Sequence, residues 1–257
     1  MIGVKKKEVF KYMFRFGMDK RTLYIIIAII VIFSLRRYLT DTNALLSLVL
    51  TLPAVLIAIT FHEFAHAFAT DKLGDDTPRR QGRLTLNPLA HLDPVGSLML
   101  VFAGFGWGKP VEINPSNFKR TISMSKGEAI VAIAGPLMNL LLAIIFTFLY
   151  FIIVKFATAF CLTQVGLIIL TLIQTTIIIN IGLGVFNLIP LPPLDGSKVL
   201  KHFLPYKVKD WFERYSQVFY IIFVVLWVTD LAGIIISPVI SAVYTGIVSL
   251  IGHLFGM

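Results

Sequence analysis

Three ionisable residues, His62, Glu63 and His66, close an apolar run that begins near Ala44. On a helix, residues four apart project from one face about one turn from each other, so both imidazoles can bind one metal ion. Glu63, next to the first histidine, can then act as general base toward a water that the metal activates. The alternative is a pair of core histidines beside a buried, neutral glutamate. That alternative leaves three desolvation costs unexplained at the end of an apolar span, so we favour the metal site.

The third metal ligand has to come from elsewhere in the chain. A catalytic zinc site usually has three protein ligands and a water, and the only cysteine, Cys161, cannot build a cysteine-based site. Asp195 follows three prolines, which cannot continue a helix and should direct the chain toward the bundle interior. By itself the pair Asp195-Gly196 would be an ordinary turn. Beside a site that lacks one ligand, Asp195 becomes the preferred third ligand, although two histidines and a carboxylate also suit iron.

The other histidines are weaker candidates for ligands. His91 lies between Asn87-Pro88 and Asp93-Pro94, so we expect it in a turn, hydrogen-bonded to a backbone carbonyl. His202 and His253 fit solvent or interface positions.

The elements that must position these residues are membrane spans. The mean hydropathy is +0.84 and only 14% of the residues are charged, whereas ordinary soluble domains are roughly a quarter charged. We therefore predict an all-α, polytopic integral membrane protein in contact with the lipid bilayer. Six transmembrane helices are expected, at residues 22–39, 43–70, 127–156, 165–189, 216–231 and 233–254.

The distribution of basic residues predicts the topology. With a cytoplasmic N-terminus, 20 of the 23 lysines and arginines fall on the cytoplasmic side, as the positive-inside rule requires. We expect both termini in the cytoplasm and a multi-pass protein of a bacterial plasma membrane. The net charge of +9 does not indicate nucleic acid, because the basic residues cluster beside apolar segments, where they meet anionic headgroups.

We expect a single membrane-embedded domain over residues 1–257, with its core at 43–205 and a basic amphipathic segment at 1–21. The stretch 71–126, between the second and third spans, is predicted to hold a short β or re-entrant element. Residues 83–86 and 110–113 alternate as strands would, while 95–105 is apolar but too short to cross a bilayer.

Longer motifs around these residues resemble those of the site-2 proteases, zinc metalloproteases that cleave within membranes. HEFAH at 62–66 and NLIPLPPLDG at 187–196 look like the two signature motifs of that family. AGPLMN at 134–139, NPLAHLDP at 87–94 and FGWGKPV at 105–111 are supporting matches, and the resemblance runs from about residue 43 to 205. The PDZ and CBS domains that relatives often carry have no room in this chain.

The resemblance implies that His62, His66 and Asp195 bind Zn²⁺ and that Glu63 is the general base. Asn139 is our candidate for a catalytic donor to the oxyanion, with a tie between helices as the competing role. The motifs also supply substrate-binding candidates, which are Gly106, Trp107, Lys109, Val111, Asn187 and Pro190. The implied substrate is a single-pass membrane protein, cleaved in or near its transmembrane segment.

Two other functions compete with an intramembrane endopeptidase. A metal transporter would place His, Glu and Asp along an ion path and would normally need further intramembrane ligands or a second site. We find neither in the interiors of the spans at 216–231 and 233–254. A catalytically inactive membrane scaffold would not need Glu63 beside a complete ligand set. We therefore expect an enzyme.

Overall fold

The computed structural model describes residues 38–94, 108–229 and 231–257, together with residues 32, 35–36, 96–97 and 102. Over these residues the chain is helical and contains no β-strand, with a single isolated bridge between Leu92 and Gly108. The chain divides into two compact units, residues 1–48 with 93–107, and residues 49–92 with 108–257. The second unit contains every candidate site residue that the structure describes.

Four of the described helices are long and apolar enough to cross a membrane, at Ala44–Lys72, Met124–Phe156, Gln164–Asn187 and Gly233–Leu254. The helices that contain them are α3 (Thr42–Lys72), α6 (Met124–Phe156), α8 (Gln164–Asn187) and α12 (Leu231–Leu254). The predictions of spans at 43–70, 127–156, 165–189 and 233–254 are thereby confirmed.

Short elements connect the long helices. They are α4 (Thr77–Arg80), η1 (Pro88–Ala90), η2 (Pro115–Asn117), α7 (Thr158–Cys161), α9 (Asp195–Phe203), α10 (Tyr206–Arg214) and α11 (Ser216–Val228). Polar caps define where two of the spans begin. Ser123 accepts a hydrogen bond from the backbone of Lys126 at the start of α6, and Thr163 accepts one from Gly166 at the start of α8.

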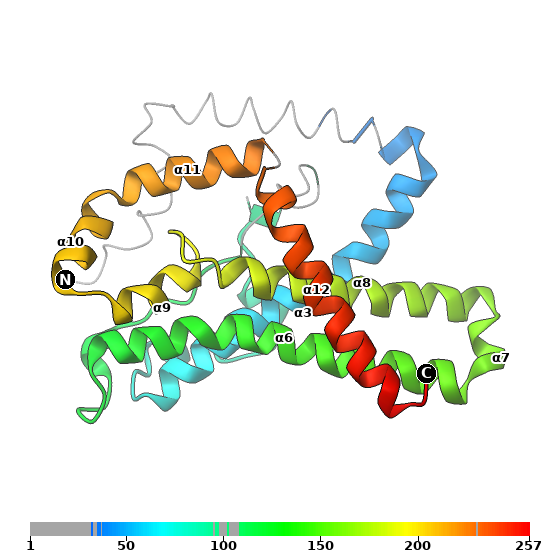
Figure 1. Ribbon diagram of the computed structural model, residues 1–257, viewed down its shortest axis with the longest axis horizontal. Coiled ribbons are helices and arrows are strands. Elements are labelled where there is room, and N and C mark those ends of the chain that lie inside the picture. The colour runs from blue at the N-terminus through cyan, green and yellow to red at the C-terminus, as the bar shows by residue number, and fades with distance from the viewer. Residues whose placement is uncertain are drawn as a thin grey trace. The chain divides into compact units, whose positions relative to one another are not determined.

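The apolar core lies where α6, α8 and α12 meet, and Figure 1 shows α12 crossing the other two helices. Its buried members are Ala143 on α6 and Ile173, Ile177 and Ile181 on α8. A smaller cluster joins Leu73, Phe118 and Val131, and so attaches the segment that follows α3 to the start of α6. These two clusters fix α3, α6 and α8 around the site described below.

The six-helix prediction is confirmed only in part. The segment expected to span at 216–231 forms α11, which has 13 residues and a length of about 20 Å, against a hydrocarbon core of about 30 Å. It is therefore too short to cross a bilayer by itself. Most of the span expected at 22–39, and all of the amphipathic segment expected at 1–21, lie outside the described residues.

The strands predicted at 83–86 and 110–113, within the stretch 71–126, are not formed. Residues 83–86 lie in bends and coil, and residues 109–114 are coil, with no ladder between them. Sequence alternation marks alternate burial of side chains, but a strand also requires a partner along its length. The isolated bridge joins Leu92 to Gly108 and lies outside both segments. Most of the re-entrant segment expected at 95–105 lies outside the described residues.

Candidate metal centre

His62 and His66 lie on the same face of α3, one turn apart, and both are buried, with exposed fractions of 6% and 8%. Their Nε2 atoms are 3.0 Å apart. The two rings meet edge to face, with centroids 4.6 Å apart and an interplanar angle of 86°. The helical spacing therefore brings two nitrogen donors to one point.

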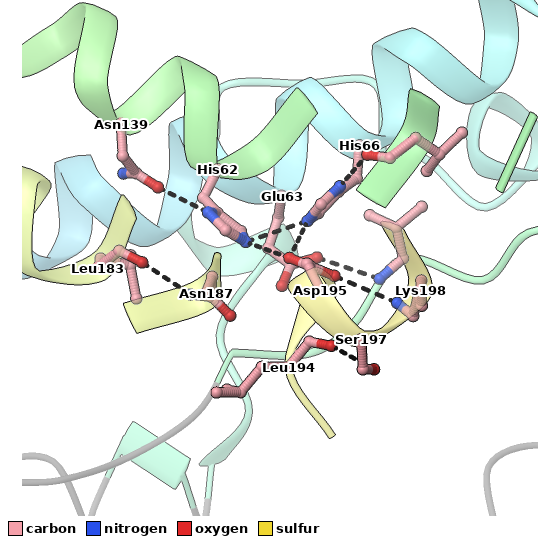
Figure 2. A network of polar contacts seen from close by, with 12 residues as sticks. His62, Glu63, His66, Asn139, Leu183, Asn187, Leu194, Asp195, Ser197 and Lys198 are labelled. Atoms are coloured by element: carbon pink, nitrogen blue, oxygen red, sulfur yellow. Dashed lines mark hydrogen bonds and ion pairs between the residues drawn. The ribbon is translucent and has the colours of Figure 1, made fainter. Parts of the chain in front are cut away.

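Asp195 reaches the same point from the opposite side. Helix α8 ends at Asn187, the chain runs without helix from Leu188 to Leu194, and α9 begins at Asp195. Its Oδ2 atom lies 3.2 Å from Nε2 of His62 and 3.0 Å from Nε2 of His66. Figure 2 shows the two imidazoles and the carboxylate pointing toward one another. The prolines thus end the helix as expected and direct the carboxylate inward.

The outer nitrogens of both rings define which ring atoms face the site. His66 Nδ1 lies 2.7 Å from the backbone oxygen of Val131, which can only accept, so this nitrogen carries the proton. His62 Nδ1 lies 2.6 Å from Oδ1 of Asn139. With Nδ1–H donated outward on both rings, both Nε2 lone pairs point at the Asp195 carboxylate.

This donor set fits a zinc ion. Two imidazole nitrogens and a carboxylate oxygen all lie within 4.8 Å of one another in a buried position. Zn–N and Zn–O bonds of about 2.0–2.2 Å in tetrahedral geometry separate neighbouring ligand atoms by about 3.3 Å, close to the observed 3.0–3.2 Å. Acceptors this close and this buried repel one another unless a metal cation or a proton lies between them.

Charge around Asp195 favours its ionised form. Burial raises the pKa of Asp195, but the imidazoles of His66 and His62, when protonated, and the ammonium of Lys198 lower it by more, so the pKa lies well below its usual range. The Lys198 Nζ atom is 3.2 Å from Oδ1, the oxygen that faces away from the histidines. Lys198 therefore holds one carboxylate oxygen while the other faces the site.

Asn139, on α6, connects the site to α3 and α8 through hydrogen bonds. While its Oδ1 accepts from His62, its Nδ2 donates to the backbone oxygen of Ala58 at 3.0 Å and to Oδ1 of Asn180 at 2.9 Å. Both amide hydrogens are thus engaged between helices. Of the two roles considered from sequence, these contacts favour the tie between helices over donation to an oxyanion.

Glu63 lies beside the ligands and is held through one oxygen. The Val111 backbone N–H donates to Oε2 at 3.1 Å, and Nη2 of Arg83 lies 3.8 Å from the same oxygen. Arg83 is 2% exposed and also donates to the backbone oxygens of Ala90, at 2.5 Å, and of Lys109. One buried guanidinium therefore links Glu63 to the two segments that flank it.

The substrate-binding candidates are placed as follows. Lys109 is exposed and Val111 is half-buried, and both belong to the coil segment that contacts Glu63. Asn187 closes α8, with its Nδ2 donating to Leu183 O at 3.0 Å, and Pro190 is exposed in the connection to α9. Gly106 and Trp107 lie outside the described residues.

His91 occupies the position expected from the sequence. It is fully buried, and its Nε2 lies 2.7 Å from the backbone oxygen of Thr85. Burial lowers the pKa of His91 below its ordinary value, which keeps the ring neutral near pH 7. It packs in the loop before Leu92 and is not among the three convergent ligands.

Two residues of the site were missed by sequence reasoning. Asn180 is a polar residue inside an apolar span, a signal that indicates an intramembrane function. Arg83 had no such signal, because an arginine in a connecting segment fits a solvated surface equally well. Its partners only become visible once the chain is folded.

Comparison with known proteins assigns the family. The family description "Peptidase family M50" matches residues 50–229. "Putative zinc metalloprotease YwhC" of Bacillus subtilis (strain 168) is 37% identical over 211 residues, covering 81% of this chain and 92% of that protein. "Putative zinc metalloprotease Rip2" of Mycolicibacterium smegmatis (strain ATCC 700084 / mc(2)155) is 31% identical over 185 residues, covering 70% of this chain and 67% of that protein.

A Mycobacterium tuberculosis (strain ATCC 25618 / H37Rv) protein of the same name is 29% identical over 205 residues, covering 72% of this chain and 75% of its own. No solved structure matches the chain. The matched region contains α6 and α8, most of α3, and all the convergent residues of the site. The chain therefore belongs to peptidase family M50 and is an integral membrane peptidase.

Proposed function

We propose that this protein is a zinc metalloendopeptidase that hydrolyses peptide bonds in or near transmembrane segments of membrane-anchored proteins. One observation carries the proposal. Two imidazole nitrogens and a carboxylate oxygen converge within 3.0–3.2 Å, next to Glu63, between helices apolar enough to span a membrane. The zinc metalloprotease names of the relatives support the choice of metal and reaction.

In this proposal His62, His66 and Asp195 hold the zinc ion. When bound, zinc supplies a Lewis acid that polarises the scissile carbonyl and makes water more acidic. The protein contributes the geometry. Val131 and Asn139 orient the two imidazoles, and Lys198 restrains the carboxylate through Oδ1.

Glu63 is proposed as the general base. Its contacts with Val111 and Arg83 are both made to Oε2. Oε1 then takes a proton from the attacking water and passes it to the leaving amine, which departs as a neutral group. Holding one oxygen fixes the carboxylate plane, so the base is oriented before the substrate arrives.

The proposed substrate is a single-pass membrane protein. A peptide bond within a transmembrane helix is protected by its helical hydrogen bonds, so cleavage requires local unwinding and new partners for the freed groups. The coil segment at 109–114 offers backbone groups beside Glu63, with Lys109 and Val111 as contacts. Asn187, the last residue of α8, and Pro190, in the connection from α8 to Asp195, are further proposed contacts.

We further propose a bacterial plasma membrane with both termini in the cytoplasm. The positive-inside bias supports this orientation, and the similar proteins are bacterial. The metal centre would then open toward the cytoplasmic side, where water can reach it.

The experiment compares wild type with Glu63→Gln, using purified protein in liposomes that contain a panel of single-pass membrane peptides. We expect the variant to retain stoichiometric zinc and to lose cleavage by about 10²-fold or more. Glu213→Gln, an exposed carboxylate in α10, is the matched control and should cleave like wild type. Cleavage by Glu63→Gln at the wild-type rate would show that the base is misassigned. Zinc flux without cleavage in the same liposomes would instead indicate transport.

A further inference from the structure

Helix α8 carries a fully buried asparagine, Asn180, in the middle of an apolar span. Its exposed fraction is 0%, and its neighbours Ile177 and Ile181 belong to the apolar core. A polar side chain at such a position is costly unless its hydrogen-bonding groups are satisfied, and it usually marks a function. The metal centre does not include Asn180, so its presence needs an account.

A continuous hydrogen-bond chain leads from Asn180 to the metal centre. Asn180 Oδ1 accepts from Asn139 Nδ2 at 2.9 Å, and Asn139 Oδ1 lies 2.6 Å from Nδ1 of His62. At its far end, Asn180 Nδ2 donates to the backbone oxygen of Thr176 at 2.8 Å. Three helices, α8, α6 and α3, are connected by this chain, and Figure 2 shows its last bond, from Asn139 to His62.

The direction of this chain is set by two backbone carbonyls. The carbonyl of Thr176 can only accept, so Asn180 must turn its NH₂ toward Thr176 and its oxygen toward Asn139. The carbonyl of Ala58 likewise takes a hydrogen from Asn139, at 3.0 Å. The NH₂ group of Asn139 therefore faces two acceptors, and its oxygen is left to accept a hydrogen bond from His62.

We propose that Asn180 is a positioning residue for the metal centre. By fixing the orientation of the Asn139 amide, it fixes the tautomer of His62 that carries the proton on Nδ1 and leaves Nε2 free to bind the metal. This inference rests on the proposed role of His62 as a zinc ligand. It extends that role to a residue on another helix, two hydrogen bonds away.

The effect of losing Asn180 follows from the alternatives left to Asn139. With Ala58 as the only remaining acceptor, one of the two constraints on the amide is lost, and rotation that turns its NH₂ toward His62 costs less. His62 then accepts at Nδ1 and carries its proton on Nε2, where it blocks binding. Residues that orient metal ligands typically contribute about 10–100-fold to metal affinity. Because Asn180 contacts the orienting residue Asn139 and not the ligand itself, we expect its loss to weaken zinc binding about tenfold.

The test measures the zinc dissociation constant of the metal-free protein in detergent, by competition with a chelator of known affinity. Asn180→Leu, which keeps the branching and the number of side-chain heavy atoms, is expected to weaken zinc binding about tenfold. Asn180→Ala makes the same test if the leucine variant does not fold. Thr176→Val is the matched control. Thr176 is 1% exposed on the same helix, but its hydroxyl bonds only to Leu172 O, so zinc affinity should stay within about twofold of wild type.

A second variant, Asn139→Asp, distinguishes a positioning role of Asn180 from a general loss of helix packing. In Asn139→Asp, either carboxylate oxygen can accept from His62, so the orientation no longer needs Asn180. Adding Asn180→Leu to that background should change zinc affinity by less than about threefold. Wild-type affinity in Asn180→Leu, an equal loss in Thr176→Val, or an undiminished loss in the Asn139→Asp background would each overturn the proposal.

The same titration distinguishes this inference from the proposed function. His66→Ala should weaken zinc binding whether or not Asn180 matters. If His66→Ala binds zinc like wild type, the ligand assignment fails and the positioning role fails with it. If only the Asn180 variants behave like wild type, the positioning role alone is wrong.

Discussion

The substitution Gly135→Ala gives the most direct test of how the two histidines are packed. Gly135 lies on α6 against both rings, and a Cβ atom added there would be 2.5 Å from Nε2 of His66 and 2.7 Å from Cε1 of His62. Carbon contacts are normally about 3.5 Å or longer, so a ring would have to retreat by about 1 Å. Metal–ligand distances tolerate about 0.2 Å. One imidazole is therefore expected to leave the ligand set.

The size of the loss can be worked out from ligand energetics. Four-ligand zinc sites bind with about 10–16 kcal/mol, which is about 2.5–4 kcal/mol per ligand. Losing one ligand therefore weakens zinc binding by about 10²–10³-fold. At a zinc concentration of 100 times the wild-type dissociation constant, wild type gains about 2.7 kcal/mol of stability, whereas the variant gains about 0.4 kcal/mol or less.

Without zinc, the substitution should not lower the free energy of unfolding. Alanine is favoured over glycine in a helix interior by about 1 kcal/mol, so removing zinc should not leave the variant less stable than wild type unless the rings fail to relax. The assay is thermal unfolding in detergent with and without zinc, together with a chelator-competition titration. The control is Gly246→Ala on α12, where an added Cβ meets nothing within 4 Å.

Wild-type zinc affinity in Gly135→Ala would contradict this prediction, because the imidazoles could not then lie against α6 as described. An equal loss of zinc in Gly246→Ala would also refute it, since zinc loss would then follow any change in a spanning helix.

Three further predictions concern the segments around Glu63. Arg83→Met leaves the carbonyl oxygens of Ala90 and Lys109 without their donor and should lower the free energy of unfolding by about 1–3 kcal/mol. Hydrogen exchange over residues 108–113 should become faster, and unchanged exchange would contradict this. Val111→Pro removes the N–H that holds Glu63 and should lower turnover about 10–100-fold without loss of zinc, and unchanged cleavage of a membrane peptide would count against it. Burial raises the pKa of Asp75, but hydrogen bonds to its carboxylate lower the pKa below its ordinary value. The ionised carboxylate therefore stabilises the folded protein above about pH 4, and this stabilisation is lost as the pH falls. The melting temperature of metal-free Asp75→Asn should therefore fall less steeply in acid than that of wild type, and parallel curves would reject this account.

Much of the metal centre could be predicted because its signals are local. The four-residue interval between His62 and His66 needs only helical periodicity to bring two imidazoles together. The prolines between Asn187 and Asp195 end a helix through their missing N–H groups, wherever that helix lies. Four long spans follow from apolar length alone, and all four are found in the described residues.

The connecting segments were predicted less well, for a physical reason. Alternation at 83–86 and 110–113 was interpreted as strand, but a strand exists only with a partner along its length. In the folded chain one backbone group of the second segment and one just before it already have side-chain partners. Val111 donates to Glu63, and the carbonyl of Lys109 accepts from Arg83.

By itself, then, the sequence determined which residues can do chemistry and on which helices they stand, because spacing and hydropathy act over a few neighbouring residues. Tertiary structure decided their partners. It joined Asp195 to histidines 133 and 129 positions earlier, assigned Asn139 to His62, and placed Asn180 behind Asn139. Those contacts depend on how α3, α6 and α8 pack, and packing is set by the whole apolar core rather than by any one segment.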